Sequence, residues 1–256
     1  MASPAQIHSP KRTIAIVQSN YLPWRGYFDL IRSVDELILF DSVQYTRRDW
    51  RNRNVIKTPQ APHWITVPVE VKGRFRQPID ETRIADAGWA ERHIRTIEAN
   101  YRRAACFANV GPWLFETMRA AAAEPLLTHV NERLLRAIAE RLQIRTPLRR
   151  CTELLDRAEM AGMDASTRLL ALCRAAGAEC YLSGPAARDY LDESLFASAG
   201  IEVAWMHYGG YPDYPQLWGA FEPQVSVVDL LLNVGDKAPA FLGRAHGEDY
   251  STEGAS

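Results

Sequence analysis

The chain has 256 residues, 47% of them hydrophobic and 24% charged, which is typical of a folded globular protein that buries a full core. Its formal net charge of −1 offers no overall basic surface, so we expect no nucleic-acid partner. No apolar run approaches the roughly 18 to 20 residues that span a bilayer, and the N-terminal residues lack the apolar core of a secretory signal. We therefore expect a cytoplasmic protein with no membrane partner.

The first third of the chain predicts a strand–helix–strand unit followed by further strands. The apolar patterns indicate a buried strand over 14–17, a loop over 19–26, an amphipathic helix over 28–34 and a second strand over 36–40. That order favours a right-handed crossover and a parallel sheet. Alternating β-branched residues predict a third strand over 64–71, and another short strand is expected over 79–84.

From about residue 88 the hydrophobic period becomes helical, and it stays so to about residue 145, which predicts a helical subdomain. The remaining elements are a helix over 166–176, strands over 179–183 and 201–206, and a closing helix over 226–233. We therefore predict one α/β domain over 13–243, with a Rossmann-like parallel sheet and a helical insertion. A disordered lead-in over 1–12 and a loose tail over 244–256 are expected to flank it.

The cysteines do not suggest a metal site. The sequence contains no CxxC pair, and the spacing of its cysteines does not suit structural zinc. They are Cys106, Cys151, Cys173 and Cys180. We expect free buried thiols, without an activated cysteine nucleophile.

The loop from Gln18 to Tyr27 is the first candidate site. A loop between a parallel strand and its helix directs backbone N–H groups toward a ligand, and a phosphate or carboxylate suits that position. Gly26 would permit close approach. Neither GxGxxG nor a P-loop lysine is present, and an ordinary turn with Tyr21 and Trp24 in the core is the alternative.

The segment from Asp41 to Asn54 is the second candidate, because it gathers many functional groups after a strand. Asp41 would act as a general base or hold an ammonium group, and the arginines would grip phosphates or carboxylates. Tyr45 and Trp50 would stack on a sugar or a base. The alternative is a solvated basic loop in which Asp41 pairs with a neighbouring arginine.

Three further places have functional and structural interpretations. His93 would be an acid–base group, or a hydrogen-bonded helical residue. Ser183 and Gly184 would bind a ligand, or cap a helix, and they lack the GxSxG pattern of a hydrolase nucleophile. The side chains of 208–216, with Asp229, would line a pocket, or would tie down a long loop.

Four segments of this sequence resemble the WbqC-like protein family. They are IAIVQSNYLPWRGYFDLIRSVDELILFDSVQYTRRDWRNRN, HIRTIEANYRRAACF, YLSGPAARDYLD and YPQLWGAFEPQVSVVDLLLNVG, and together they span residues 13–235. The resemblance implies a transferase in O-antigen or specialised-metabolite biosynthetic gene clusters. It also implies that the functional positions are Gln18, Asn20, Tyr21, Gly26, Tyr27, Asp41, Gln44, Tyr45, Arg48, Trp50, Asn52, Arg53, His93, Ser183, Gly184, Gln216 and Asp229. The chain has Asp41 and Ser42 where the family pattern has two aspartates, which disfavours a metal site there.

A more distant resemblance concerns LPWRGYFDLIRSVDELILF, which is similar to the opening of HIGH-type nucleotidyltransferases and pantothenate synthetase. It implies a sheet of the HUP, nucleotidyltransferase-like kind and a loop that holds ATP phosphates. Tyr27 stands where such a motif has its second histidine, which places the ATP chemistry in question.

The leading hypothesis is an acyltransferase that forms an amide bond. The resemblance implies that an acyl or aminoacyl group moves from a phosphopantetheine thioester on an acyl or peptidyl carrier protein to a small-molecule amine, such as an amino sugar. Asp41 or His93 would deprotonate the amine. Backbone N–H groups near Gly26, with Asn52 or Arg48, would stabilise the oxyanion. No cofactor would be required. The alternatives are an ATP-dependent ligase or nucleotidyltransferase, and a non-catalytic module that binds a carrier protein or sugar nucleotide.

Overall fold

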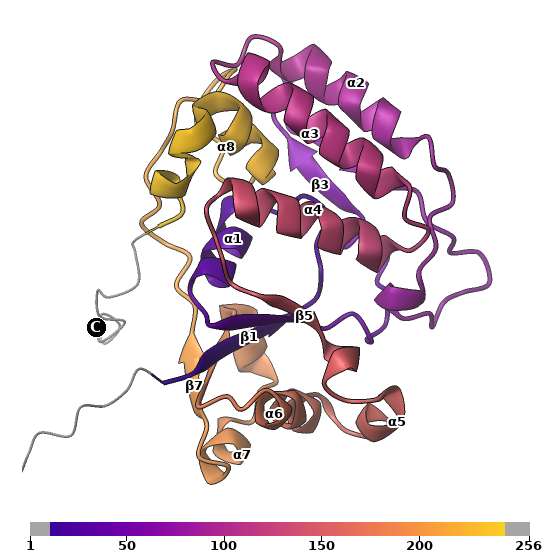
Figure 1. Cartoon of the computed structure of the whole chain (residues 1–256), viewed down its shortest axis with the longest axis vertical. Helices are drawn as coiled ribbons and strands as arrows, with labels where there is room; N and C mark the ends of the chain where they lie inside the picture. Colours follow the sequence, from indigo (N-terminus) through magenta and orange to yellow (C-terminus); the bar gives the residue numbers. More distant parts are fainter. Residues whose placement is uncertain (1–10, 244–256) are drawn as a thin grey trace, which may run out of the picture.

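The computed structural model describes residues 11–243, and a five-stranded, fully parallel sheet lies at its centre (Figure 1). Its strands are β1 (Thr13–Val17), β2 (Glu36–Leu39), β5 (Leu148–Arg150), β6 (Cys180–Ser183) and β7 (Glu202–Trp205), in the order β5-β2-β1-β6-β7. The sheet therefore grows outward from β1 in both directions. The predicted tail over 244–256, and the lead-in except for Lys11 and Arg12, lie outside the described residues.

The sheet is covered on both faces, which explains why its strands are apolar runs rather than alternating sequences. Ile14 and Ile16 of β1 join one hydrophobic cluster, and Ala15 between them joins the other. In β2, Ile38 belongs to the first cluster and Leu37 to the second. Successive side chains of a strand thus enter opposite cores.

Helices form a layer on each side of the sheet. In Figure 1 the upper layer contains α1 (Arg25–Arg32), α2 (Trp89–Tyr101), α3 (Phe107–Ala122), α4 (Leu127–Arg141) and α8 (Val227–Val234). The lower layer contains α5 (Arg157–Met160), α6 (Ala165–Ala175) and α7 (Glu193–Ser198). Short 3-10 helices follow at η1 (Ile79–Glu81), η2 (Cys151–Glu153), η3 (Pro185–Asp189) and η4 (Gly235–Phe241).

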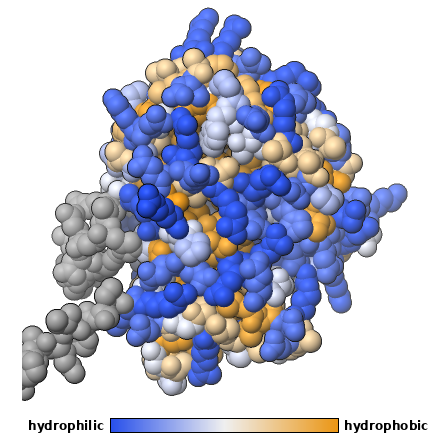
Figure 2. Space-filling view, in the orientation of Figure 1, coloured by the Kyte–Doolittle hydropathy of each residue, from blue (hydrophilic) through white to orange (hydrophobic). Residues whose placement is uncertain are grey.

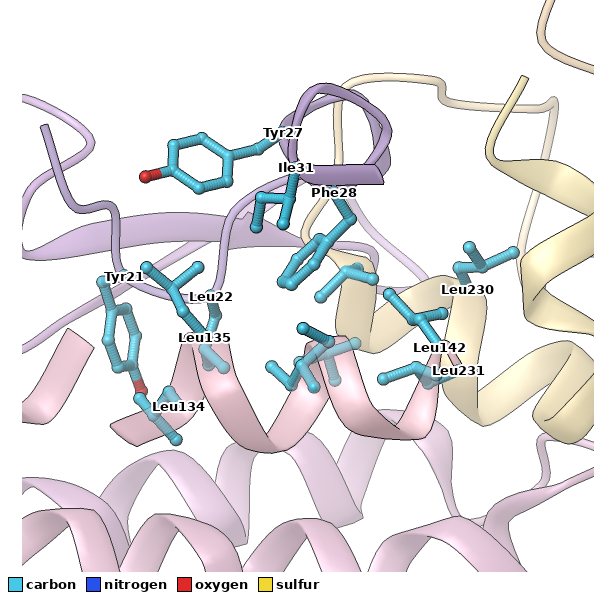
Figure 3. Packing of buried hydrophobic residues seen from close by; sticks show 14 of the residues in the cluster. Tyr21, Leu22, Tyr27, Phe28, Ile31, Leu134, Leu135, Leu142, Leu230 and Leu231 are labelled. Atoms are coloured by element: carbon cyan, nitrogen blue, oxygen red, sulfur yellow. The ribbon is translucent and has the colours of Figure 1, made fainter. Parts of the chain in front are cut away.

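The larger core is built where α1, α4 and α8 meet. Figure 3 shows the side chains of Phe28 from α1, Leu135 from α4 and Leu231 from α8 pointing into one cluster. All three are completely buried. Helix α3 packs on α2, α4 and α8, so the helices within the predicted 88–145 segment share this core.

The prediction for 64–71 is wrong in its extent. The strand β4 covers only His63–Thr66, and it pairs antiparallel with β3 (Arg53–Ile56) in a separate two-stranded hairpin. Pro68 lacks the N–H that a longer ladder would need. Strand β3 is not predicted, because its first two residues, Arg53 and Asn54, belong to the candidate segment from Asp41 to Asn54.

The expected strand over 79–84 is also wrong, since residues 79–81 form the 3-10 helix η1. Pro78 precedes it, and its carbonyl accepts a hydrogen bond from the Thr82 hydroxyl at 2.9 Å, which favours a turn. Strand β5 was not predicted, because three residues directly after Pro147 give no readable period. The missing strand matters, because its end contributes to the site described below.

Hydrophilic residues cover much of the face shown in Figure 2, with smaller hydrophobic areas between them. Within residues 11–243, no helix combines the length and the apolar character needed to cross a membrane. The four cysteines are free thiols, as predicted, and only Cys106 is not fully buried.

Candidate functional site

Asp41 lies just after β2, at the carboxyl edge of the sheet. Its side chain is buried, at 3% exposure. One carboxyl oxygen accepts the backbone N–H of Ser19 at 2.8 Å, and the other accepts the hydroxyl of Thr128 at 2.5 Å. Asp41 is therefore fixed between the loop after β1 and the first turn of α4.

Burial raises the pKa of the Asp41 carboxyl above its ordinary value of 3.8. The hydrogen bonds from Ser19 and Thr128 and the positive charge of Arg51 oppose this shift. A carboxylate with a raised pKa is a stronger base than one in water, so Asp41 suits proton abstraction.

A polar cavity of about 250 Å³ opens beside Asp41. Four parts of the chain supply its lining: the end of β2, η1, the start of α4, and the segment from β5 to α5. The lining residues are Leu39, Asp41, Asp80, Thr128, His129, Arg150, Cys151, Thr152 and Arg157. Carboxyl ends of parallel strands build its floor, where open α/β sheets place ligands.

Asp80 gives this cavity a second carboxylate. Its backbone N–H donates to the Asp41 carbonyl at 3.0 Å, and its side chain pairs with Arg157 at 2.6 Å. Burial raises the pKa of Asp80, and the nearby charge of Asp41 adds to the increase, while Arg157 opposes it. The cavity therefore contains the Asp41 carboxyl group beside an Asp80–Arg157 ion pair.

The cavity also contains one thiol and a second arginine. Burial raises the pKa of the Cys151 thiol, whose Sγ lies 3.4 Å from the Ser42 hydroxyl, so this cysteine stays protonated near neutral pH. Arg150 is held by Glu132, with 2.6 Å between its Nη2 and Oε2. The guanidinium groups of Arg150 and Arg157 thus have fixed orientations.

The loop after β1 is tied to the segment around Arg51. The Gln18 carbonyl accepts the Tyr27 hydroxyl at 3.0 Å and an Arg51 N–H at 3.4 Å. Arg51 also donates to the side-chain oxygen of Asn20. Asn131 connects these two segments, since its amide donates to Ser19 Oγ at 3.0 Å and to the Arg51 carbonyl at 2.9 Å.

Leu22 has a φ of 42°, which is unusual for a residue with a side chain. The Leu22 carbonyl accepts the Ser226 hydroxyl at 2.7 Å, and the preceding Tyr21 N–H donates to the Trp50 carbonyl at 3.0 Å. Surrounding hydrogen bonds thus hold a strained backbone at the edge of the site, a combination typical of functional loops.

A second cavity, of about 230 Å³, adjoins this loop, and its lining residues are Asn20, Pro23, Trp24, Trp50, Asn54 and Gln224. The indole of Trp24 lies across the first turn of α1, and a Cβ on Gly26 would overlap that ring. Gly26 was expected to let a ligand approach closely. The structure instead has the Trp24 side chain in that space.

Other predicted residues of the Asp41–Asn54 segment do not line the Asp41 cavity. The Gln44 amide donates to the Phe75 carbonyl at 3.0 Å, and Tyr45 is buried. The Asn52 amide is also buried and donates to the Val67 carbonyl at 2.7 Å, beside the β3–β4 hairpin. Arg48 is exposed, and its carbonyl accepts a hydrogen bond from Arg53.

His93 lies on α2, and both of its ring nitrogens have partners inside the protein. The Thr66 carbonyl lies 3.1 Å from Nε2 and can only accept, so Nε2 carries the proton. The hydroxyl of Tyr21, at 2.8 Å, then donates to Nδ1. His93 would have to break one of these bonds before it deprotonated a substrate, and it does not line either cavity.

Burial lowers the pKa of His93 to about 4, from the ordinary 6.5. The unfolded chain therefore binds a proton between these pH values that the folded protein does not, so acidification from 6.5 to 4 destabilises the fold. At about 1.4 kcal/mol per pH unit, the loss approaches about 3 kcal/mol. Urea denaturation at pH 7 and at pH 4 would measure this loss. We expect the free energy of unfolding to fall by about 3 kcal/mol more in native protein than in the His93→Gln variant.

The exposed His207 provides the matched control. His207→Gln should follow the native curve at every pH. A native-minus-His93→Gln difference that stays constant with pH would show that His93 is not held neutral in the fold.

Ser183 and Gly184 end β6, next to the β1 loop. The Ser183 hydroxyl lies 3.3 Å from the hydroxyl of Tyr181, and both are buried. A Cβ on Gly184 would meet the Tyr208 hydroxyl at 3.7 Å, and the Tyr208 ring lies 5.4 Å from that of Trp24. Neither Ser183 nor Gly184 lines either cavity.

Gln216 and Asp229 belong to a different polar cluster, and neither lines either cavity. The Gln216 side-chain oxygen accepts the Lys57 ammonium group at 2.8 Å. The completely buried Asp229 accepts the Tyr101 hydroxyl at 2.8 Å. The cluster ties α8 and the loop before it to β3 and α2.

Several residues of the Asp41 cavity were not predicted: Asp80, Thr128, His129, Arg150, Cys151, Thr152 and Arg157. Arg150 ends β5 and Cys151 directly follows it, which is a useful signal only once β5 is recognised. Among the described residues, no group of three or more His, Cys, Asp or Glu side chains is arranged to hold a metal ion.

The model for the WbqC-like protein family matches residues 18–240 of this chain. A similar protein is "Uncharacterized protein Rv1507c" of Mycobacterium tuberculosis (strain ATCC 25618 / H37Rv), which is 52% identical over 232 residues. That similarity covers 90% of this chain and 97% of the relative. No solved structure matches the chain. The matched range contains every lining residue of both cavities.

Proposed function

Since the chain belongs to the WbqC-like protein family, we propose that it is a biosynthetic transferase that forms an amide bond. It moves an acyl or aminoacyl group from a thioester to an amine, such as that of an amino sugar. One observation carries this proposal: Asp41, a buried carboxyl group with a raised pKa, lies beside Asp80 in a cavity large enough for a small substrate. That environment suits the binding and deprotonation of an ammonium group.

In the proposed reaction, the ammonium group of the acceptor binds between Asp41 and Asp80 and gives one proton to Asp41. The free amine then attacks the thioester carbonyl, so a C–N bond forms. As the tetrahedral intermediate collapses, the C–S bond breaks and the thiolate takes the proton from Asp41 to leave as a thiol, which restores the Asp41 carboxylate. The second amine proton passes to solvent, which keeps the proton balance.

Negative charge develops on the carbonyl oxygen during this attack, and a cation near the cavity would stabilise it. Arg150 and Arg157 line the cavity and are oriented by ion pairs, so they suit this role better than Arg48, which is exposed. Direct aminolysis is preferred over an acyl-enzyme because the Cys151 thiol has a raised pKa. Trapping an acyl group on Cys151 would contradict this mechanism.

The thioester supplies the free energy of the reaction, so the proposal needs no cofactor. We propose a phosphopantetheine thioester as donor, presented by an acyl or peptidyl carrier protein. The segment 44–77 favours such a phosphorylated partner, because it contains eight lysines and arginines and two acidic residues in a chain of net charge −1.

An ATP-dependent ligase or nucleotidyltransferase is the second candidate, and the strand order favours it. In chain order, the sheet strands follow the 3-2-1-4-5 arrangement of Rossmann-like folds, and β1 and β6 flank the point where the order reverses. Nucleotides bind at such switch points. This hypothesis expects release of AMP or pyrophosphate from ATP, which direct aminolysis does not.

Mass spectrometry of reaction mixtures would test the proposal. The protein is incubated with acyl- and glycyl-pantetheine thioesters and a panel of amino sugars, with and without ATP and magnesium. We expect an amide product and an equal amount of free thiol without ATP. A product that requires ATP would favour the ligase, and binding without turnover by any donor would favour a non-catalytic binding module.

A further inference from the structure

The tryptophan-lined cavity is not used by the chemistry proposed for Asp41. Two indoles, one proline and three amide side chains line it: Trp24, Trp50, Pro23, Asn20, Asn54 and Gln224. Its volume is about 230 Å³. Aromatic faces with a few amide groups at the edges are the surroundings that proteins provide for flat heterocycles.

Both tryptophans are held in place before any ligand arrives. Trp24 lies over Gly26, and the Tyr208 and Tyr211 rings lie 5.4 Å and 5.8 Å from it. Trp50 packs on Trp64 with 5.1 Å between ring centroids. Fixed aromatic walls lose little conformational entropy when a ring stacks on them.

Trp50 is also unusually accessible for its type, at 42% exposure. Its partner Trp64 has the same exposed fraction, and the Arg53 guanidinium lies 4.1 Å above the Trp64 ring. A large aromatic side chain that is both oriented and solvent-exposed is typical of a binding surface rather than of a core.

Polar groups of the cavity match the edges of a nucleobase. Asn54 is 2% exposed and fixed at both ends of its amide, because its nitrogen donates to the Tyr21 carbonyl at 3.1 Å and its oxygen accepts the Val55 N–H at 2.7 Å. Its second amide N–H and the amides of Asn20 and Gln224 are the groups that can meet the edge of a base. The cavity follows β1, next to the strand-order switch where α/β sheets bind nucleotides.

Arg51 links this cavity to Asp41. Its guanidinium donates to the side chain of Asn20, which lines the tryptophan cavity, and its charge lowers the pKa of Asp41. Its only ion-pair partner among residues 11–243 is Asp49, at 3.6 Å, so the charge is incompletely neutralised. The Arg51 guanidinium lines neither cavity, but it contacts a lining residue of one and acts on Asp41 of the other, and a guanidinium is the side chain that best pairs with a diphosphate.

We propose that the tryptophan cavity binds the nucleoside of a nucleoside-diphosphate-linked amine acceptor. The base stacks between Trp24 and Trp50, Arg51 contacts the diphosphate, and the amine at the far end of the molecule reaches Asp41 and Asp80. The identity of this acceptor rests on the proposed amide-forming function. Nucleotide binding itself does not depend on catalysis and can be measured alone.

Isothermal titration calorimetry with UDP, dTDP, ADP, uridine and pantetheine would test this inference. We expect a nucleoside diphosphate to bind, and Trp50→Ala to weaken that binding about tenfold or more, because base–aromatic stacking is lost. Phe75→Ala is the matched control, since Phe75 is an aromatic residue at 75% exposure that lines neither cavity. Arg51→Gln should lower the affinity for UDP more than that for uridine.

Other outcomes separate this inference from the proposed function. If pantetheine binds and Trp50→Ala weakens it, while nucleotides do not bind, the cavity holds the thioester donor; the inference fails and amide formation stands. Unchanged nucleotide affinity in Trp50→Ala also overturns the inference. If nucleoside diphosphates bind as expected but no nucleotide-linked amino sugar is acylated, the site stands and the proposed function fails.

Discussion

Replacing Asp41 with asparagine is expected to lower the rate of amide formation by about 10²- to 10⁴-fold, the usual contribution of a general base. Asparagine keeps the shape of the side chain. Its oxygen can accept the Ser19 N–H, and its amide can donate to the Thr128 hydroxyl that now donates to Asp41. The fold should therefore survive, and the loss should appear in turnover at saturating amine and thioester.

The pH profile gives a readout that a purely structural role would not produce. Because burial raises the pKa of Asp41, the basic form accumulates only as pH rises through a value above the ordinary 3.8. We expect kcat/KM of native protein to rise across that range. The acid limb should be missing from the residual activity of Asp41→Asn.

Asp35→Asn is the matched control, because Asp35 is exposed and binds the Thr13 N–H at 2.7 Å, at the amino end of β1. It should retain native turnover. An Asp41→Asn variant with native activity would remove Asp41 as the base, and attention would then move to His129, the imidazole that lines the same cavity.

Much of the sheet could be predicted because its inner strands β1, β2 and β6 are largely buried apolar runs. The bounds of these strands, and of the less buried β7, differ from the predicted ones by no more than one residue at either end. The hairpin β3–β4 could not be recognised in the same way. Its first strand begins RN, and the functional groups of those residues suggested a loop rather than a ladder.

The sequence singles out only part of the lining of the candidate Asp41 cavity, and the reason is physical. Asp41 could be identified because it follows a strand. Thr128, which completes its hydrogen bonding, lies 87 positions further along the chain, on a helix assigned by its apolar face alone. Long-range contacts of this kind leave no periodic signal. Asp80 likewise lies in a 3-10 helix that resembled a strand.

Residues that the family pattern favours do not all share one role. Asn52 is buried and holds the Val67 carbonyl, and His93 has both ring nitrogens bonded. Such residues fix the framework on which the cavity is built. The residues of the family pattern therefore differ in their surroundings, and mutagenesis is needed to separate substrate contacts from structural hydrogen bonds.

Asp229 provides the sharpest test of that distinction. It is completely buried, and it accepts hydrogen bonds from the Tyr101 hydroxyl at 2.8 Å and from the Asn233 amide at 3.3 Å. The Lys57 charge also favours its ionised form. We expect Asp229→Ala to lower the free energy of unfolding by about 3–5 kcal/mol, because these buried groups lose their acceptor.

Urea denaturation would measure this loss, with Asp236→Ala as the control. Asp236 pairs with Arg141 at 2.8 Å on the surface, where its side chain is 72% exposed, so its removal should change stability by about 1 kcal/mol or less. If Asp229 instead binds substrate, Asp229→Ala would keep native stability and lose activity. That result would return Asp229 to the candidate site.

The pH dependence of Asp229→Asn completes the test. Burial raises the folded pKa of Asp229 above the ordinary 3.8, so the protonated form is favoured by folding. Its stabilising contribution is therefore full below the ordinary value and is lost as pH rises through the folded pKa. Asparagine cannot ionise, so the stability difference between native protein and Asp229→Asn should shift in favour of the variant as pH increases.

A difference that does not change with pH would mean that Asp229 ionises as easily in the fold as in the unfolded chain. The buried cluster would then require solvent or a cation that compensates its charge.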